Sequence, residues 1–121
     1  MALKFKKKIF VFDIDNTICY TKKNYYEKSK PNKKIINLIN NLKKRGHTIN
    51  FYTSRYMGRT NQNIKLVNKK YKRKTQNQLK KWGIQYNKLI MGKPSYDLFI
   101  DDRSLNPKHI DIFKHLIKFT K

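Results

Sequence analysis

The stretch Ile9-Phe10-Val11-Phe12-Asp13-Ile14-Asp15-Asn16-Thr17 decides how the rest of the chain is interpreted. Its first four residues are all apolar and are β-branched or aromatic, which predicts a short strand buried on both faces. The apolar run ends at Asp13, and Asp15 follows two positions later. An Asp-x-Asp pattern arises too often by chance to indicate a function alone. Its meaning therefore depends on the segments around it.

Three further apolar runs along the chain predict strands, namely residues 48–53, 88–91 and 98–100. Helical patterns separate the first three strands from one another. Strands that alternate with helices favour a parallel sheet with right-handed crossovers. We therefore expect an α/β fold, a Rossmann-like three-layer sandwich with a short and mostly parallel sheet.

The helices are predicted from the spacing of their apolar residues. Positions i, i+3, i+4 and i+7 form one apolar face in a first helix, which has Ile35, Leu38, Ile39 and Leu42. Pro31 suits its first turn and Gly46 the position past its end. Residues 60–82 have helical character, and their lysine-rich middle can divide them into two helices. A last helix is expected to start near Asn106 and Pro107, with these residues facing inward: Ile110, Phe113, Leu116 and Ile117.

The composition constrains the class of protein and its partners. The chain has 121 residues, which predicts one domain over residues 1–121. Its 30 Lys and Arg against 7 Asp and Glu give a formal net charge of +23, and the excess is almost all lysine. Such a charge is typical of proteins that bind nucleic acid through its phosphates. It is also typical of lysine-rich composition from an A- and T-rich genome, which is the favoured interpretation, and both interpretations stay open.

The sequence also indicates where the protein works. No apolar run approaches the roughly 18 residues that a membrane span requires, and the basic start does not resemble a signal peptide. Cys19 is the only cysteine and cannot form an internal disulfide. We therefore expect a cytoplasmic protein without a membrane partner.

Four of the seven acidic residues occur in two tight pairs, and each pair follows an apolar run. The pairs are Asp13 with Asp15 and Asp101 with Asp102. A lysine-rich chain that keeps carboxylates together in this way is expected to hold a cation there. Hard oxygen ligands suit Mg²⁺, which takes few carboxylates and keeps several waters. The pairs therefore predict a magnesium site.

Other polar residues follow the remaining strands. Thr53, Ser54 and Arg55 come at the end of the second strand, and Lys93 lies in the turn Gly92-Lys93-Pro94 after the third. In a parallel sheet, ligands bind beyond the carboxyl ends of the strands. We therefore expect these groups to converge with the carboxylates. A carboxylate, a cation and a hydroxyl together suit phosphoryl transfer through an aspartyl-phosphate.

This set of motifs resembles the haloacid dehalogenase superfamily. The resemblance rests on Phe12-Asp13-Ile14-Asp15-Asn16-Thr17, then Thr53, Lys93 and Asp101-Asp102, in that order, over about residues 8–105. The segments 51–55, 78–83 and 92–94 further resemble small members associated with capsular polysaccharide biosynthesis and sugar-phosphate hydrolysis. The superfamily fold implies the strand order 3-2-1-4, numbered along the chain, for the expected sheet.

The resemblance implies a role for each matching residue. Asp13 is the expected nucleophile and a Mg²⁺ ligand. Asp15 is the expected general acid and base, and its backbone carbonyl also binds the metal. Thr53 is expected to hold the transferring phosphoryl group, with Lys93 steadying it. The expected third metal anchor is Asp101, and Asp102 binds the ion directly or through water. Asn16 stands where glycine is common, and asparagine tolerates the same left-handed turn.

The connections leave no room for a large cap domain, since residues 19–30 form only a short flap or loop. We therefore expect an open site for a phosphomonoester, with a sugar phosphate favoured as the substrate. Ser54 and Arg55 are candidate substrate-binding residues, although Arg55 is equally suited to a surface ion pair. The alternatives are a polynucleotide 3′-phosphatase and a non-catalytic nucleic-acid-binding protein on the same scaffold. An oligomer that completes its site in trans also stays open.

Overall fold

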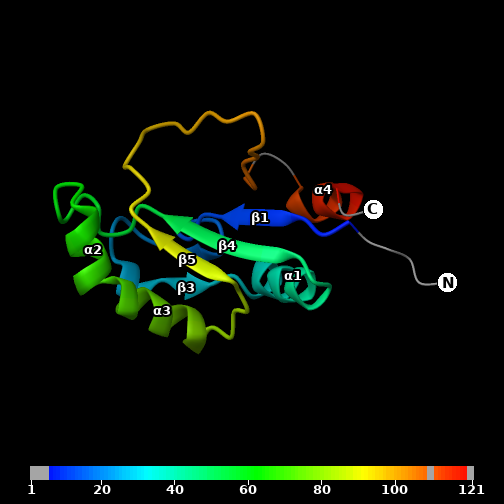
Figure 1. Cartoon of the computed structure of the whole chain (residues 1–121), viewed down its shortest axis with the longest axis horizontal. Helices are drawn as coiled ribbons and strands as arrows, with labels where there is room; N and C mark the ends of the chain where they lie inside the picture. Colours follow the sequence, from blue (N-terminus) through cyan, green and yellow to red (C-terminus); the bar gives the residue numbers. More distant parts are fainter. Residues whose placement is uncertain (1–5, 109–110, 120–121) are drawn as a thin grey trace.

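The core of the protein is a three-stranded parallel sheet. The computed structural model describes residues 6–108 and 111–119, without the side chains of residues 113 and 117–119. The strands are β1 (Ile9–Phe12), β4 (Thr48–Thr53) and β5 (Lys88–Met91), in the order β1-β4-β5 (Figure 1). The strands predicted at 9–12, 48–53 and 88–91 are thereby confirmed.

Four α-helices accompany the strands in the described residues: α1 (Lys33–Lys44), α2 (Ile64–Lys70), α3 (Lys72–Lys81) and α4 (Ile112–Phe119). The predicted break within residues 60–82 is confirmed at Tyr71, which ends α2 and precedes α3. Helix α1 begins after Pro31, because Asn32 caps it by accepting a hydrogen bond from the Ile35 N–H. No helix in the described part of the chain has the length and apolar character to span a bilayer.

Helix α4 begins later than the sequence predicts. The side chain of Asn106 accepts the N–H of Lys108, which forms a local turn before the helix. Leu116 is buried as expected. Ile110 and the side chains of Phe113 and Ile117 lie outside the described residues, so their expected inward orientation stays a prediction.

The flap between β1 and α1 is a small hairpin. Strands β2 (Cys19–Tyr20) and β3 (Lys30–Pro31) pair antiparallel, and the 3-10 helix η1 (Tyr26–Lys28) lies between them. The Asn32 N–H donates to the carbonyl of Ile18 and ties the base of the hairpin to the segment after β1.

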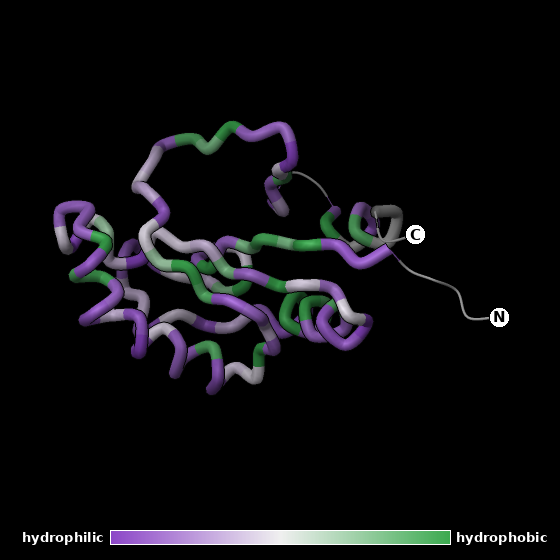
Figure 2. Tube along the Cα trace, viewed as in Figure 1, coloured by the Kyte–Doolittle hydropathy of each residue, from purple (hydrophilic) through white to green (hydrophobic). Residues whose placement is uncertain are grey.

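The sheet buries one face much more than the other. Phe10, Phe12 and Phe51 alternate inward and pack with the apolar face of α1, while Ile9 and Val11 are 71% and 60% exposed. Apolar residues are concentrated on the strands and α1, whereas α3 is largely hydrophilic (Figure 2). The expected α/β class and the mostly parallel sheet are confirmed, and the expected three-layer arrangement stays a prediction. Two successive right-handed crossovers in the order β1-β4-β5 place their helices on the same face of the sheet.

The predicted fourth strand is also wrong, and the strand order 3-2-1-4 is not matched. Leu98, Phe99 and Ile100 belong to a loop that arches from β5 towards α4 (Figure 1), and they are 76%, 46% and 86% exposed. A parallel strand after β5 requires a crossover of about a dozen residues. Residues 92–97 are too few to provide one. Local apolarity alone suggested the strand.

His47 is a buried titratable residue that directly precedes β4, at the edge of the sheet opposite Asp13. Its ring is buried, its Nδ1 accepts the Lys8 N–H at 3.0 Å, and it packs edge-on against Phe10. Burial lowers the pKa of His47 below its ordinary value of 6.5. The neutral imidazole is therefore the form that fits the fold.

We expect the protein to lose stability as the pH falls through 6.5. Below this pH the unfolded chain binds a proton at His47 that the folded chain resists, so protonation favours unfolding. The expected contribution is about 1 kcal/mol, since the buried hydrogen bond is also lost. Urea unfolding at pH 7.5, 6.5 and 5.5 measures it. His47→Asn, which keeps an acceptor, should flatten the pH dependence, whereas the same change at the exposed His115 should not. Equal slopes for both variants contradict the assignment.

Candidate functional site

Polar residues from all three strands meet at the carboxyl edge of the sheet. Asp13 follows β1 directly, Thr53 ends β4, and Lys93 comes two residues after β5. The Lys93 N–H donates to the Thr53 carbonyl at 3.1 Å, which continues the register between β4 and β5. Asp13, Thr53 and Lys93 therefore share one edge of the sheet, as the strand pattern predicts.

Asp13 occupies a partly enclosed position in this group. Its Oδ1 accepts the N–H of Ile14 at 2.9 Å. Burial raises the pKa of the Asp13 carboxyl, and the positive charge of Lys93 counteracts part of that rise. The reactivity of Asp13 as a carboxylate thus depends on the ammonium group beside it.

Asp15 is held by a buried arginine. The Arg55 Nε lies 2.9 Å from Oδ2 and Nη2 lies 2.9 Å from Oδ1, which is a two-pronged ion pair. The Thr21 hydroxyl donates to the same Oδ1 at 2.6 Å. Only 1% of the Arg55 side chain is exposed, against 20% for Asp15. The predicted general acid is therefore engaged through both oxygens.

Arg55 does not face a substrate in this arrangement. Its remaining N–H groups reach Oε1 of Gln78 at 2.6 Å and Oγ of Ser29 at 3.3 Å. The interpretation of Arg55 as an ion-pair residue is confirmed, although the pair is buried instead of lying on the surface. The desolvated guanidinium requires these partners, which explains why it is turned inward.

Thr53 and Ser54 form the turn beneath the site. The Thr53 Oγ1 is buried and accepts the Arg55 N–H at 3.1 Å, which leaves the hydroxyl with its own proton to donate. Ser54 is partly buried, and its carbonyl accepts the N–H of Met57. The expected phosphoryl-holding role of Thr53 is compatible with this geometry.

Lys93 is enclosed by aromatic rings. Its Nζ donates to the Tyr96 hydroxyl at 2.9 Å and lies 4.8 Å from the centre of the Tyr96 ring. The rings of Phe99 and Tyr52 are 4.9 Å and 5.9 Å away. Cation–π contacts of this kind stabilise a partly desolvated ammonium. They hold the charge of Lys93 close to Asp13.

Gly92 makes the turn that delivers Lys93 to the site. Its φ is +93°, and a Cβ there would lie 2.9 Å from Cγ2 of Ile64. Left-handed backbone of this kind disfavours any residue with a side chain.

We expect Gly92→Ala to destabilise the protein by about 1–2 kcal/mol, because the new methyl group meets both an unfavourable φ and the Ile64 side chain. Urea unfolding measures the change. Gly58→Ala is the matched control, since nothing lies within 4 Å of a Cβ at Gly58 and its φ is not positive. A loss at Gly92 no larger than at Gly58 contradicts the expectation.

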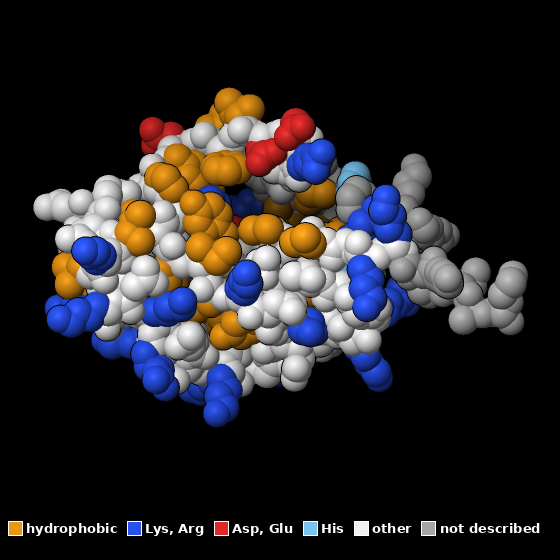
Figure 3. Space-filling view, viewed as in Figure 1, with side chains coloured by type: hydrophobic (Ala, Val, Ile, Leu, Met, Phe, Trp, Pro, Cys, Tyr) orange, Lys and Arg blue, Asp and Glu red, His pale blue; other side chains and the backbone are white. Residues whose placement is uncertain are grey.

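The second acidic pair lies away from this group. Asp101 and Asp102 are exposed in the loop after β5, and the acidic side chains gather over that loop in Figure 3. The Arg103 N–H donates to Asp101 and lowers the pKa of that carboxyl. The expected convergence of Asp101 and Asp102 with Asp13 is not found, because the short connection after β5 forms no fourth strand.

The Mg²⁺ site expected from the two acidic pairs stays a prediction. Among residues 6–108 and 111–119, no group of three or more His, Cys, Asp or Glu side chains is placed to hold a metal. The Asp15 carboxylate is paired with Arg55. Of the four predicted metal-binding carboxylates, Asp13 is therefore the one that lies at the strand ends without a guanidinium partner. A ligand set for Mg²⁺ ordinarily needs more than one oxygen donor from the protein or substrate.

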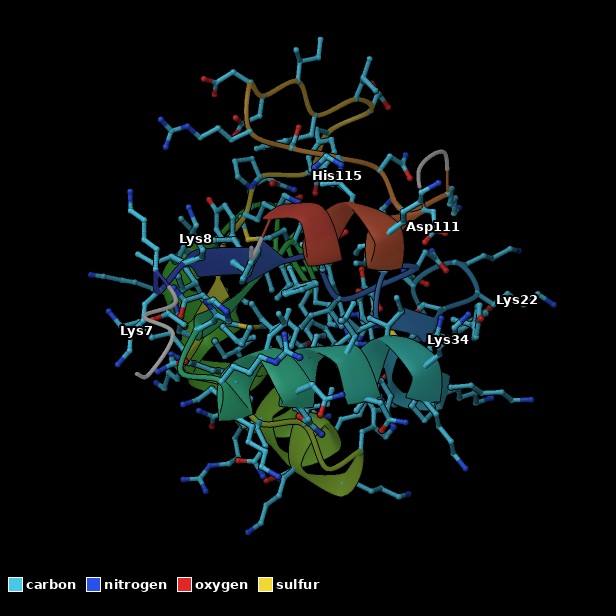
Figure 4. All side chains as sticks on the ribbon, turned by 90° about the vertical axis from the view of Figure 1, so that its right-hand side faces the viewer. Lys7, Lys8, Lys22, Lys34, Asp111 and His115 are labelled. Carbon is cyan, nitrogen blue, oxygen red and sulfur yellow. The ribbon has the colours of Figure 1, made fainter. Side chains whose placement is uncertain are left out.

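An open hollow of about 510 Å³ adjoins the segment that follows Asp15. Its lining is about equally polar and apolar and comes from three regions: Asn16, Thr17, Tyr20, Asn32, Lys34, Ile35, Pro107, Lys108, Asp111 and Ile112. Figure 4 shows Lys34 at the start of α1 and Asp111 before α4 on the same side of the molecule. The hollow offers room beside the candidate site for a polar group.

Sequence reasoning missed several residues that shape the site. Thr21, Ser29 and Gln78 orient the Asp15–Arg55 pair, and Tyr96 orients Lys93. No local pattern marks them, because Gln78 is 23 residues from Arg55 along the chain. The one available signal was Arg55, an arginine directly after a buried strand in a chain whose other cations are mostly lysines.

Comparisons with known proteins bear on the fold. No family model matches the chain, and no curated protein matches it. The structure is similar to the crystal structure of an MCSG target from Vibrio cholerae, with a TM-score of 0.78 and 22% sequence identity. The match covers 96% of this chain and 100% of the other. At this identity the likeness shows a shared α/β fold alone.

Proposed function

We propose that the protein is a phosphomonoester hydrolase in which Asp13 is the nucleophile. The observation that carries the proposal is the placement of Asp13, Thr53 and Lys93 at the ends of three neighbouring parallel strands. Ligands of open α/β sheets bind at this edge. A carboxylate, a hydroxyl and a cation at one edge supply a nucleophile and two groups that bind phosphoryl oxygens.

The proposed reaction has two steps. The Asp13 carboxylate attacks phosphorus, the bond to the leaving oxygen breaks, and an aspartyl-phosphate forms. Water then attacks the phosphorus and releases inorganic phosphate and the free carboxylate. The Lys93 ammonium offsets the negative charge of the substrate, and the Thr53 hydroxyl donates to a phosphoryl oxygen.

The leaving oxygen must gain a proton during the first step. Asp15 is the proposed donor, and it later accepts a proton from the attacking water. This use of Asp15 requires one of its oxygens to be released from Arg55. Dependence on Mg²⁺ also belongs to the proposal. No step is assigned to the ion, because the described carboxylates do not converge on a common position.

The proposed substrate is a sugar phosphate or related metabolite. The hollow beside Asp15 has polar side chains in its lining, among them Asn16, Thr17 and Asn32, which suit a hydroxylated leaving group. The flap is only a hairpin with one 3-10 turn, which keeps the site open. A cytoplasmic location agrees with such a substrate and with the single free cysteine, Cys19.

A polynucleotide 3′-phosphate is the second candidate substrate. Exposed Lys and Arg side chains cover α2 and α3, including Lys65, Lys69, Lys70, Arg73 and Lys74, and Figure 3 shows blue side chains along that part of the surface. Cationic surfaces of this kind bind phosphate backbones.

Phosphate release from a panel of esters tests the proposal. The panel includes hexose and heptose phosphates, a 3′-phosphorylated oligonucleotide and p-nitrophenyl phosphate, each with Mg²⁺ and with EDTA. Faster hydrolysis of sugar phosphates supports the favoured substrate class. Equal or faster hydrolysis of the oligonucleotide replaces it with the second candidate. A folded protein that releases no phosphate from any ester, while binding the oligonucleotide with steep salt dependence, is a non-catalytic nucleic-acid-binding protein instead.

A further inference from the structure

Arg55 connects three parts of the molecule through one guanidinium group. Nε and Nη2 bind Asp15 in the segment after β1, Nη2 also reaches Ser29 in the flap, and Nη1 binds Gln78 in α3. The Gln78 amide in turn donates to the Tyr26 carbonyl, which is also in the flap. Each contact uses a different direction of the planar fork.

The fork geometry is specific to arginine. A guanidinium offers fixed, parallel N–H groups that match both oxygens of a carboxylate, whereas a lysine ammonium is a single point charge on a flexible stem. The Nε–Oδ2 and Nη2–Oδ1 distances of 2.9 Å therefore set the orientation of the Asp15 carboxylate as well as its position.

The partners of Arg55 limit how far that orientation can change. The side chain is 1% exposed, and Tyr26 lies with its ring centre 5.2 Å from the guanidinium carbon. Tyr26 also packs edge-on against Tyr56, so the wall beside Arg55 is aromatic and closely packed. Asp15 is more accessible, at 20%, and is the member of the pair that can reach a substrate.

We propose that Arg55 is a positioning residue that orients the Asp15 carboxylate towards the leaving oxygen. Through Arg55, this orientation depends on the flap and on α3. The inference rests on the proposed function. Arg55 touches no reacting atom in this role and acts through Asp15. Ser29 of the flap and Gln78 of α3 bind the Arg55 guanidinium, which in turn binds Asp15. A substrate that moves the flap therefore also moves the Asp15 carboxylate.

The leaving group of the substrate separates this role from a purely structural one. An alkyl or sugar phosphate has a poor leaving group that needs a proton from an acid, whereas p-nitrophenolate leaves with little assistance. If the Asp15 carboxylate is wrongly oriented, hydrolysis of the sugar phosphate should therefore slow far more than hydrolysis of p-nitrophenyl phosphate. General acid catalysis contributes about 100-fold or more, which sets the size of the expected gap.

The test compares kcat/KM of the wild type and Arg55→Lys on glucose 6-phosphate and p-nitrophenyl phosphate. We expect about a 100-fold loss on the sugar phosphate and less than about a 5-fold loss on the nitrophenyl ester. Arg73→Lys is the matched control, because Arg73 is an exposed arginine on α3. It should change neither rate.

A second variant covers the case in which Arg55→Lys does not fold. Gln78→Met removes the acceptor for Nη1 and the contact with Tyr26 but keeps the volume and the helix. It should produce the same selective loss at a smaller size, about 5- to 10-fold on the sugar phosphate. Equal losses on both esters, or no loss on either, overturn the inference while leaving the proposed function in place. A folded wild type that hydrolyses neither ester overturns both.

Discussion

Asp13→Asn is expected to reduce phosphate release by at least about 1,000-fold without unfolding the protein. The amide cannot attack phosphorus, so the aspartyl-phosphate does not form. Folding should be unaffected, because the amide oxygen still accepts the Ile14 N–H. Burial raises the pKa of Asp13, so a neutral side chain is favoured at this position and the variant should be at least as stable as the wild type.

The measurement is phosphate release under single-turnover and steady-state conditions, with urea unfolding of both proteins alongside. Asp97→Asn is the control, because Asp97 is an exposed acid in the loop after β5. It should leave both rate and stability unchanged. An Asp13→Asn protein that retains more than about a tenth of the activity would show that another group is the nucleophile.

Asp15→Ala is expected to destabilise the protein by about 3 kcal/mol. The substitution leaves the Arg55 guanidinium buried without its counter-charge, which is the costly way to break a buried ion pair. The Thr21 hydroxyl also loses its acceptor. Gln78 and Ser29 remain as neutral partners, which keeps the loss at the lower end of the range for buried pairs.

Urea unfolding of Asp15→Ala and of Asp97→Ala measures this effect. The exposed Asp97 should change the free energy of unfolding by less than about 0.5 kcal/mol. Combining Asp15→Ala with Arg55→Met should recover part of the loss, because the buried charge is then removed together with its partner. Additive losses in the double variant would mean that the two side chains do not depend on one another.

The elements of this protein follow closely from local patterns. Buried residues alternate along β4, and α1 buries one apolar face. Both features follow the order of apolar residues in the sequence. The division of residues 60–82 was also readable from the lysine-rich middle. Periodicity predicts these features because it determines which side of an element is apolar, and that depends on neighbours within a few positions.

The failures occurred where a local pattern needed a distant partner. Leu98-Phe99-Ile100 has the composition of a strand, but a strand exists only if another strand is available to pair with it. The connection from β5 is too short for a parallel crossover. Asp101 and Asp102 consequently lie in an exposed loop, and the carboxylate set expected for Mg²⁺ is not assembled in the described residues.

The sequence by itself determined that Asp13, Thr53 and Lys93 lie at one edge of a parallel sheet, because each comes at or directly after the end of a predicted strand. Only the tertiary structure decided how their neighbours behave. Asp15 and Arg55 are 40 residues apart, and Lys93 is enclosed by the ring of Tyr52 from β4 and that of Tyr96 from the loop after β5. The strength of a contact between charged side chains depends on their distance and burial in the folded protein. The spacing of these residues along the sequence determines neither quantity.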